Sequence, residues 1–314
     1  MFFSISLKGM NADISNRTIP EAILKRQAWK YYALMITWPV YLFLLPWVWS
    51  YNITLGFIVI VFPGIYLFTG MGFLMHECWH RYVPNVPNNF FYQIFSWFLL
   101  TDPQIYRLIH GFHHSQVNSW ADIEFHPFGQ IKLRSLRILL NISEIIFGIA
   151  ALVVFQTMVM MSSSRFRDKY RFSSLVTAVF VWIAYLTLIG WSVHQVFSIS
   201  LNGIVVPYIL MFWSGALVLH HSQLIEHGNL FIAGDWNERN IKTRNLEARG
   251  WMEKIFLFLT HGDSREHVLH HVLVSVHSRP FPGMIPLPQN AVMITFLDYR
   301  HIIFDLLSGR TSQE

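Results

Sequence analysis

The sequence has little charge and almost no cysteine. Asp, Glu, Lys and Arg make up 13% of its 314 residues, about half their share in a soluble globular domain. The single cysteine, Cys78, excludes a disulfide framework and a cysteine-ligated iron–sulfur cluster. The net charge is only +5, and no stripe of Lys and Arg alternates with aromatic residues, so we expect no nucleic-acid partner.

Apolar residues dominate instead, at 53% of the chain with a mean hydropathy of +0.38, which is typical of a membrane protein. Four apolar runs are long enough to cross a bilayer at ~1.5 Å per helical residue. They cover residues 31–50, 54–75, 173–193 and 201–219. The run at 90–100 is too short to span, and we expect it to form a buried or re-entrant helix.

Three clusters contain half of the 16 histidines. Their members are spaced by three or four residues, so a helix would place the imidazoles of each cluster on one face. One such pair alone is often no more than buried core histidines, but three clusters in one chain favour a metal site, because imidazole suits Zn, Cu, Fe and Ni. Eight histidines are too many for one ordinary metal and about right for two. The clusters are His76 and His80; His110, His113 and His114; and His267, His270 and His271.

The three clusters, read as HECWH, HGFHH and HVLHH, resemble the histidine boxes of integral-membrane fatty acid desaturases. Relatives of that family are membrane hydroxylases, alkane monooxygenases and carotenoid ketolases. The resemblance extends to Asn118, Asp122 and Glu124 after the second box, to the isolated His227, and to Thr243-Arg244-Asn245. It covers residues from about 30 to about 290.

The resemblance implies two non-haem iron ions, molecular oxygen and an acyl chain held in a kinked tunnel. Zinc has no redox chemistry, so it cannot activate oxygen for the removal of hydrogen from a methylene group, whereas iron can. Gln223 matches a water-bridging amide of some relatives, and Asn118, Asp122, Glu124 and His261 are candidates to orient ligands. Asp122 and Glu124 as plain surface charges, and His261 as a surface histidine in a polar loop, are the alternatives. The implied metal ligands are His76, His80, His110, His113, His114, His227, His267, His270 and His271. No catalytic residue is expected beyond them, and His194 and His301 are expected to be structural.

We therefore expect oxygen-dependent desaturation of a fatty acyl chain, with hydroxylation or ketolation of a lipid or carotenoid as the alternative. A histidine-rich metal transporter or a bis-histidine haem protein is a different class of candidate. A transporter should have ionisable residues within its spans, whereas these histidines lie at span ends and in polar segments.

Electrons must come from outside the chain, because it contains no fused cytochrome and no flavin or dinucleotide fingerprint. The resemblance implies a separate ferredoxin-like or cytochrome b5-like donor that docks on the cytoplasmic face. The basic segment 165–171 is a candidate contact, and lipid headgroups are an equally good partner for it.

The predicted architecture is an all-α, multi-pass membrane protein with four spans in two hairpins, interfacial helices and a cytoplasmic, histidine-rich cap. Boxes two and three must meet, so an even number of crossings separates them, and the apolar run 136–161 should not cross. That places the basic segment 165–171 in the cytoplasm, in agreement with the positive-inside rule. The predicted parts are a cytoplasmic tail at 1–29 that leads into an interfacial helix near 20–30, a membrane domain at 30–290, and a C-terminal interfacial helix and tail at 291–314.

Overall fold

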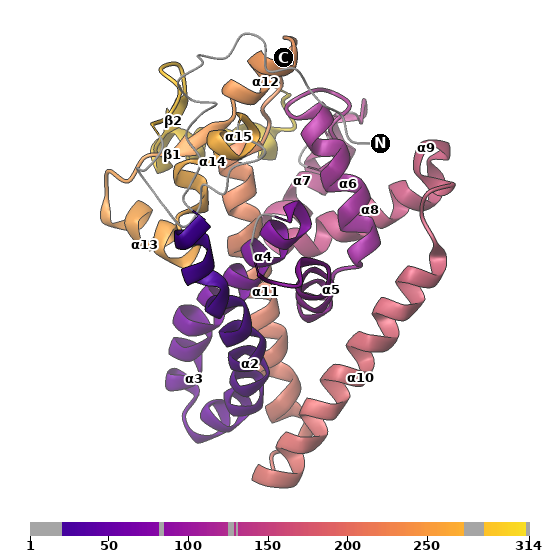
Figure 1. Cartoon of the computed structure of the whole chain (residues 1–314), viewed down its shortest axis with the longest axis vertical. Coiled ribbons are helices and arrows are strands. Elements are labelled where there is room, and N and C mark those ends of the chain that lie inside the picture. The colour runs from indigo at the N-terminus through magenta and orange to yellow at the C-terminus, as the bar shows by residue number, and fades with distance from the viewer. Residues whose placement is uncertain (1–20, 82–84, 125–128, 130, 273–285, 312–314) are drawn as a thin grey trace.

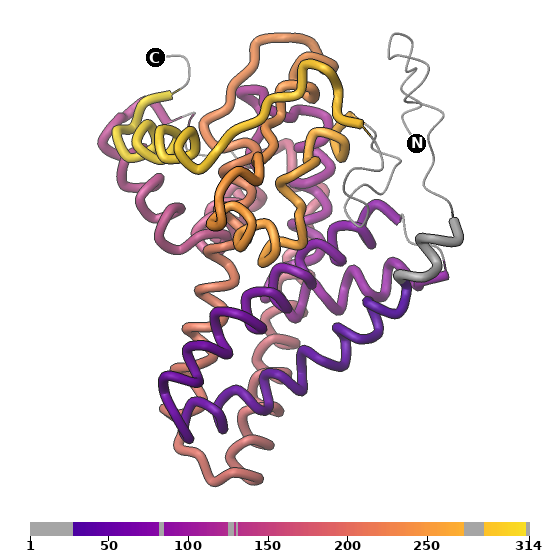
Figure 2. The backbone as a smooth tube through the Cα atoms, turned by 90° about the vertical axis from the view of Figure 1, so that its left-hand side faces the viewer, coloured from indigo at the N-terminus to yellow at the C-terminus, as the bar shows by residue number. Residues whose placement is uncertain are grey.

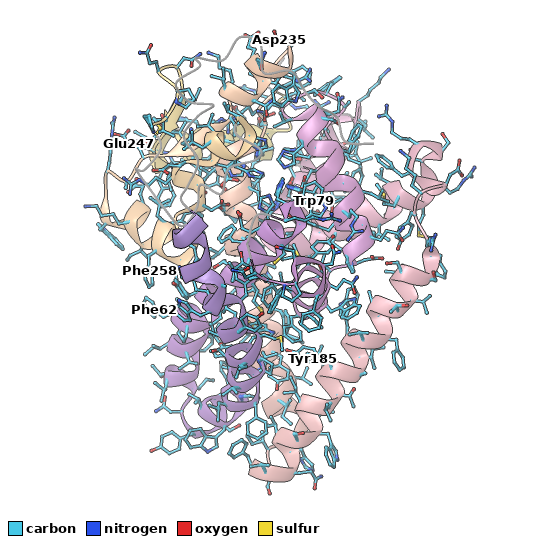
Figure 3. The ribbon with its side chains drawn as sticks, in the orientation of Figure 1. Phe62, Trp79, Tyr185, Asp235, Glu247 and Phe258 are labelled. Atoms are coloured by element: carbon cyan, nitrogen blue, oxygen red, sulfur yellow. The ribbon has the colours of Figure 1, made fainter. Side chains whose placement is uncertain are left out.

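The computed structural model describes residues 21–81, 85–124, 129, 131–272 and 286–311, and only the backbone of residues 21–27. This part of the chain is almost wholly helical, as predicted. Long helices extend from one end of the molecule, and the shorter elements gather at the other end (Figures 1 and 2). Figure 3 shows Phe62 and Tyr185 on the long helices and Asp235 and Glu247 at the opposite end, which we call the cap.

Four helical stretches are long and apolar enough to cross a membrane, so this prediction is confirmed. The second stretch is continuous although a π-helical turn interrupts it around Pro63, whose missing N–H removes one regular helix bond. Its last residues are His76 to His80, so the first histidine box lies where this span enters the cap. The stretches are α2 (Glu21–Tyr51); α3 (Ile53–Val59), η1 (Ile60–Gly64) and α4 (Ile65–His80); α10 (Phe172–Phe197); and α11 (Leu201–His227).

The apolar run 136–161 is split into two helices, α7 (Arg134–Phe147) and α8 (Ile149–Ser162). The break is at Gly148, where φ is +59° and a Cβ atom would lie 2.6 Å from the carbonyl oxygen of Ala216 in α11. Only glycine tolerates this close approach and this φ together. Each half has 14 residues, about 21 Å of helix, which is too short to cross the ~30 Å hydrocarbon core.

The cap is built from short elements that surround the ends of α4 and α11. The predicted non-spanning helix at 90–100 is present as α5, which buries Phe91, Tyr92 and Phe95. The remaining elements are α5 (Asn88–Phe98), α6 (Pro103–Gln116), α9 (Ser164–Arg167), α12 (Trp236–Ile241), α13 (Trp251–Leu259), η2 (Asp263–Arg265), α14 (His267–Val272) and α15 (Phe296–Ser308).

One small parallel sheet, which the sequence did not predict, joins the cap to the C-terminal segment. Strand β1 (Arg244–Leu246) pairs with β2 (Val292–Ile294), and Asn245 lies opposite Met293. Runs of three residues have no detectable periodicity, so pattern alone does not reveal them. The predicted C-terminal helix follows as α15.

The interfacial helix expected near residues 20–30 is not a separate element. Helix α2 begins at Glu21 and continues without a break to Tyr51. The first 20 residues of the predicted N-terminal tail and the last three residues of the C-terminal tail lie outside the described residues.

Candidate metal centre

The second histidine box lies on α6, which is anchored at its start by a buried acid. Asp102 caps this helix through the N–H of Gln104 (2.7 Å) and accepts hydrogen bonds from the hydroxyls of Tyr170 (2.9 Å) and Ser174 (2.7 Å). Ser174 belongs to α10. These hydrogen bonds therefore fix the position of the second box, on α6, relative to α10, the third of the four apolar helices.

The third box begins at the N-terminus of α14 and is held by the strand pair. The side-chain oxygen of Asn245 accepts from the N–H of Val268 at 3.0 Å, and its amide donates to the carbonyl of Val292 at 3.1 Å. His227, the last residue of α11, lies beside this box. Residues from four separate helices thus meet in the cap.

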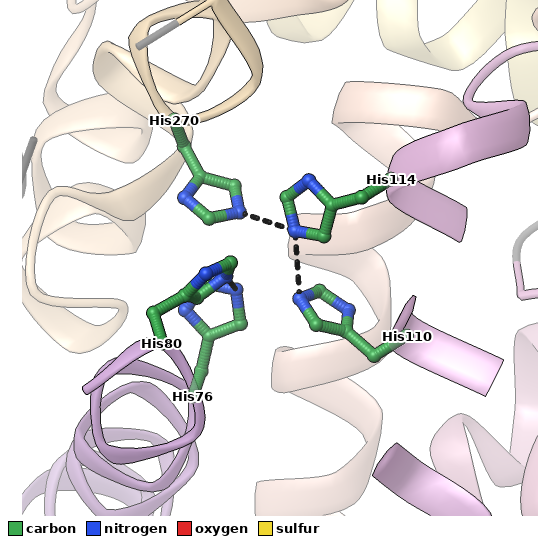
Figure 4. A group of neighbouring side chains, drawn as sticks. All are labelled: His76, His80, His110, His114 and His270. Atoms are coloured by element: carbon green, nitrogen blue, oxygen red, sulfur yellow. Dashed lines mark hydrogen bonds between the residues drawn. The ribbon is translucent and has the colours of Figure 1, made fainter. Parts of the chain in front are cut away.

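Five imidazoles form the first histidine group, which comes from all three boxes (Figure 4). Neighbouring Nε2 atoms lie 3.3 Å apart for His76 and His80, 3.0 Å for His110 and His114, and 3.1 Å for His114 and His270. All five ring nitrogens are within 4.8 Å of one another. The members are His76, His80, His110, His114 and His270.

Four imidazoles form the second histidine group, and every one of them is buried. The Nε2 atom of His227 lies 3.0 Å from that of His267 and 3.3 Å from that of His271, and the last two are 3.1 Å apart. His113 completes the set. The two groups together contain all nine histidines that the sequence predicted as ligands.

These distances fit a metal ion at the centre of each group. Ions bound by imidazole nitrogens at 2.0–2.1 Å keep neighbouring ligand atoms at about 3 Å, which matches the spacing of the Nε2 atoms. Neutral imidazoles packed this closely point lone pairs at one another, an arrangement that a central cation stabilises. The donor set is rich in nitrogen and poor in carboxylate, unlike the Glu/His di-iron sites of soluble bundles.

The chain matches the family model described as fatty acid desaturase over residues 52–282, well over half of its length. It belongs to the fatty acid desaturase family. No curated protein matches it at a significant level. Family membership and the four apolar helices make the chain an integral membrane protein of the desaturase and hydroxylase type, and thus an oxidoreductase.

In this desaturase-family protein, the residues expected to orient ligands lie against the imidazoles. Asp122 accepts from His113 Nδ1 at 2.8 Å, Glu124 from His110 Nδ1 at 3.0 Å, and Asn118 from His227 Nδ1 at 3.0 Å. A partner on Nδ1 fixes the tautomer, so that Nε2 is the atom left to bind metal. Asn118 is itself held by Thr243 (2.9 Å) and by the carbonyl of Arg239.

Burial and charge set the protonation of these histidines and of the acids beside them. Burial, reinforced by neighbouring histidines, lowers the pKa values of His114, His270 and His271 well below the usual 6.5. Burial also lowers the pKa of His113, but Asp122 and Glu124 outweigh it and the net shift is upward. For Glu124, burial raises the pKa to about 8. His114, His270 and His271 are thus neutral near pH 7, as metal ligands must be.

Two buried acids of the second group were not predicted. Glu226 places a carboxylate oxygen 3.4 Å from His267 Nε2, and Asp263 places one 3.8 Å from His267 Nδ1. Glu226 also accepts from the hydroxyl of Ser264 at 2.8 Å. The sequence did offer a signal for Glu226, because it is a charged residue at the end of an apolar span, directly before His227.

Gln223 and His261 lie in different surroundings. Gln223 lines a small cavity together with His76, His110 and His271. The ring of His261 lies outside both histidine groups, with Nε2 2.8 Å from the carbonyl of Tyr66 on α4. His194 and His301 are also remote: His194 Nδ1 lies 2.8 Å from the carbonyl of Ile199, and His301 is exposed on α15.

Three neighbouring cavities that share lining residues lie between the membrane helices and the histidines. The largest, of about 950 Å³, is almost wholly apolar and lies between α10, α11 and α8. Thr101, Ile149 and Val153 also line a second, narrower cavity. That one shares Tyr106, Gln223 and other residues with the third cavity, of about 50 Å³, which is lined by histidines of both groups.

Proposed function

We propose that the chain is an oxygen-dependent fatty acyl desaturase that binds one iron ion in each histidine group. The observation that carries this proposal is the series of cavities between the apolar membrane space and both groups. An acyl chain is the ligand that suits a long apolar channel that ends at an oxidising centre. The nine histidines are the proposed ligands.

In the proposed reaction, two neighbouring methylene groups each lose one hydrogen and a double bond forms between their carbons. O2 takes up these two hydrogens together with two electrons and two protons, and leaves as two water molecules. Two bound iron ions would supply the oxidising power for attack on an unactivated methylene group.

The side chains of the channel have the simpler task of holding the substrate. The largest cavity accommodates the apolar tail beside Phe212, Trp182 and Leu186. The narrower cavity, of about 30 Å³, is lined by Leu152 and Leu219 and marks the path along which the chain would reach the histidines. There the reacting carbons would lie against apolar side chains, next to polar ligands.

Expression of the full chain in a host without desaturases, followed by mass spectrometry of its lipids, tests the function. We expect a new mono-unsaturated acyl chain and about two iron atoms per protein, and no product from the His270→Ala protein. A new hydroxyl or keto group instead of a double bond would assign the alternative reaction. Zinc as the only metal under iron-replete conditions, or no modified lipid, would count against the proposal.

For the electron donor, we propose an acidic ferredoxin-like or cytochrome b5-like protein that docks on the basic segment 165–171. Phe166 is buried against Ile105 and Ile109 of α6, which anchors this segment on the helix of the second box. The guanidinium of Arg165 lies 4.8 Å from the ring centre of Phe112, the residue before His113. A donor seated there would be close to the second histidine group. Turnover of the purified enzyme with NADPH and oxygen alone would contradict this.

We propose that the cap faces the cytoplasm, with both ends of the chain on that side. The basic residues of the segment 165–171 are exposed at the cap end of α10, where the positive-inside rule favours the cytoplasm. Cysteine labelling tests this after replacement of Cys78. A reagent that cannot cross membranes should label Thr54→Cys in intact cells and leave Ser163→Cys unlabelled; labelling at residue 163 would overturn the orientation.

A further inference from the structure

Helix α7 has a buried polar stripe that reaches from the cap surface to the wall of the metal centre. Arg137, Asn141 and Glu144 occupy successive turns on its inner face, and all three are buried. The first two are structural: Arg137 donates to the carbonyl of Gly309 and Asn141 to that of Leu306, both at the end of α15. Glu144 points to a different partner.

Glu144 is paired with a histidine that belongs to neither histidine group. Its carboxylate lies 2.9 Å from Nε2 of His220, a residue of α11 with no exposed surface. The other ring nitrogen, Nδ1, lies 3.3 Å from the side-chain oxygen of Gln223. The amide oxygen of Gln223 can only accept, so Nδ1 of His220 donates to it, while Nε2 faces the carboxylate of Glu144.

This pairing decides what Gln223 presents to the metal centre. The amide has one accepting and one donating end, and their orientation follows from the hydrogen bonds they make. With its oxygen held by His220, the NH2 group of Gln223 is left to face the cavity that His76, His110 and His271 line. If Nδ1 were an acceptor, the amide would turn over and present its oxygen to the cavity.

A buried carboxyl–imidazole pair is expensive to desolvate, and a pair of apolar side chains would join α7 to α11 at lower cost. Arg137 and Asn141 already join α7 to the cap. The position of Glu144 and His220 behind a residue of the cavity wall therefore indicates a task in the site itself.

We infer that Glu144 and His220 are positioning residues that hold the Gln223 amide with its N–H donor directed into the metal cavity. This inference rests on the proposed desaturase function, in which O2 is reduced in that cavity. A donor at this wall stabilises negative charge as oxygen accepts electrons, so that the electrons end in water and product rather than in released hydrogen peroxide.

The test uses iron-loaded, full-length protein and azide, an anion that binds iron and accepts a hydrogen bond. Azide affinity is titrated by visible absorbance, and iron content and peroxide released per electron consumed are measured alongside. In Glu144→Gln, His220→Leu and Gln223→Leu proteins, we expect normal iron content, azide affinity lowered by about tenfold as for one hydrogen bond to an anion, and more peroxide. The His220→Leu/Gln223→Leu double variant should bind azide as tightly as either single variant and release no more peroxide, because both residues act through the same amide.

His220→Asn and Asn141→Ala are the matched controls. The asparagine amide can still donate to Gln223 from near the position of Nδ1. Azide affinity and peroxide release in His220→Asn should therefore be close to those of the wild type and unlike those of His220→Leu. Asn141→Ala loosens the same stripe of α7 without touching the pair, and it should bind azide like the wild type. If His220→Leu does not fold, Glu144→Gln and His220→Asn decide the question.

The inference would be overturned if Glu144→Gln and His220→Leu bound azide and released peroxide as the wild type does. Iron loss from either protein would also overturn it, because the pair would then serve to retain the metal. Iron content and azide affinity need no substrate. A protein that makes no unsaturated lipid would therefore refute the desaturase proposal while this binding test still reads out the position of the amide.

Discussion

The two histidine groups differ in how they are enclosed. In the first group, two of the five imidazoles, His80 and His114, are half-exposed. In the second group all four are buried, and three of them lie within 3.4 Å of Asp122, Asn118 or Glu226. Acids lie behind both groups. Glu124 and Glu77 lie 3.0 and 3.6 Å from His110 and His76 of the first group, and Asp122, Glu226 and Asp263 lie beside His113 and His267 of the second. The groups therefore differ more in enclosure than in the presence of acid partners.

This difference has physical consequences for a bound cation. Carboxylates behind the ligands make imidazole a stronger base and offset the positive charge of the ion, so they tighten binding. Full burial also slows exchange of the ion with solvent. We therefore expect the second group to hold its iron more firmly, and the first group to be the more accessible of the two.

The largest expected effect comes from removing one ligand from either group. His270→Ala in the first group and His113→Ala in the second should each lower product formation by at least about 100-fold, because the proposed oxidation of a methylene group uses both ions. Iron content should fall below two per chain in both proteins. His301→Ala, at an exposed position on α15, is the control and should keep its activity. Full activity in His270→Ala would remove the third box from the site.

The next effect is on stability at low pH, where histidines with lowered pKa values and His113, with a raised pKa, act in opposite directions. Burial lowers the pKa values of His114, His270 and His271. The unfolded chain binds protons near pH 6.5 and the folded one does not, so stability is fully present above pH 6.5 and falls below it. Each of the three contributes up to about 1.4 kcal/mol per pH unit. His113, in the second group, has a raised pKa and contributes the opposite trend, which is lost as pH rises through its folded value.

Melting temperatures of metal-free protein between pH 8 and pH 5.5 measure this balance. Three lowered pKa values outweigh one raised value, so we expect the melting temperature to fall toward pH 5.5. Iron-loaded protein should lose its metal over the same range, because protons compete for the ligands. Metal-free protein with equal stability at both ends would show that the imidazoles are not held neutral by the fold.

The sequence revealed the parts of this site that depend on local spacing. His76 and His80 are one helical turn apart in α4, and the apolar spans have the length that a bilayer demands. The partners of these histidines could not be derived in the same way. Glu226 is adjacent in sequence to His227 but contacts His267, and Glu144 reaches His220 from a helix that the sequence showed only as part of a long apolar run.

The sequence predicted that this run does not cross the membrane, but it did not predict its division into two helices. An even number of crossings required that residues 136–161 remain on one side, yet the break at Gly148 depends on the backbone of Ala216 in α11. Contacts between distant segments leave no periodic trace. For the same reason the β1–β2 pair, which positions the third box through Asn245, was not anticipated.

A smaller effect should follow from changing the acid behind one ligand. Asp122→Asn weakens the partner of His113, and we expect a 10- to 100-fold loss of iron affinity in the second group, as is typical for such partners. Glu124→Gln is the matched variant for His110 in the first group. Burial raises the pKa of Glu124 to about 8, so in the metal-free protein this carboxyl is largely protonated at pH 7. Replacing it with a neutral amide should therefore lower iron affinity less than Asp122→Asn does. Competition with a coloured chelator measures both affinities, and equal losses would contradict the difference between the groups.

The smallest expected effect is kinetic, and it tests the comparison directly. When iron-loaded protein is mixed with excess chelator at pH 7.5, iron should leave in two phases, because two of the five imidazoles in the first group are partly exposed and all four in the second are buried. Protein desalted between the phases should retain about one iron per chain, and the slower phase should be slower by about tenfold, the change produced by ~1.4 kcal/mol in the barrier. Asp122→Asn identifies the phases, since it should accelerate the slow phase and leave the fast one unchanged. A single phase, or an effect of Asp122→Asn on the fast phase alone, would mean that burial and acid partners do not distinguish the two groups.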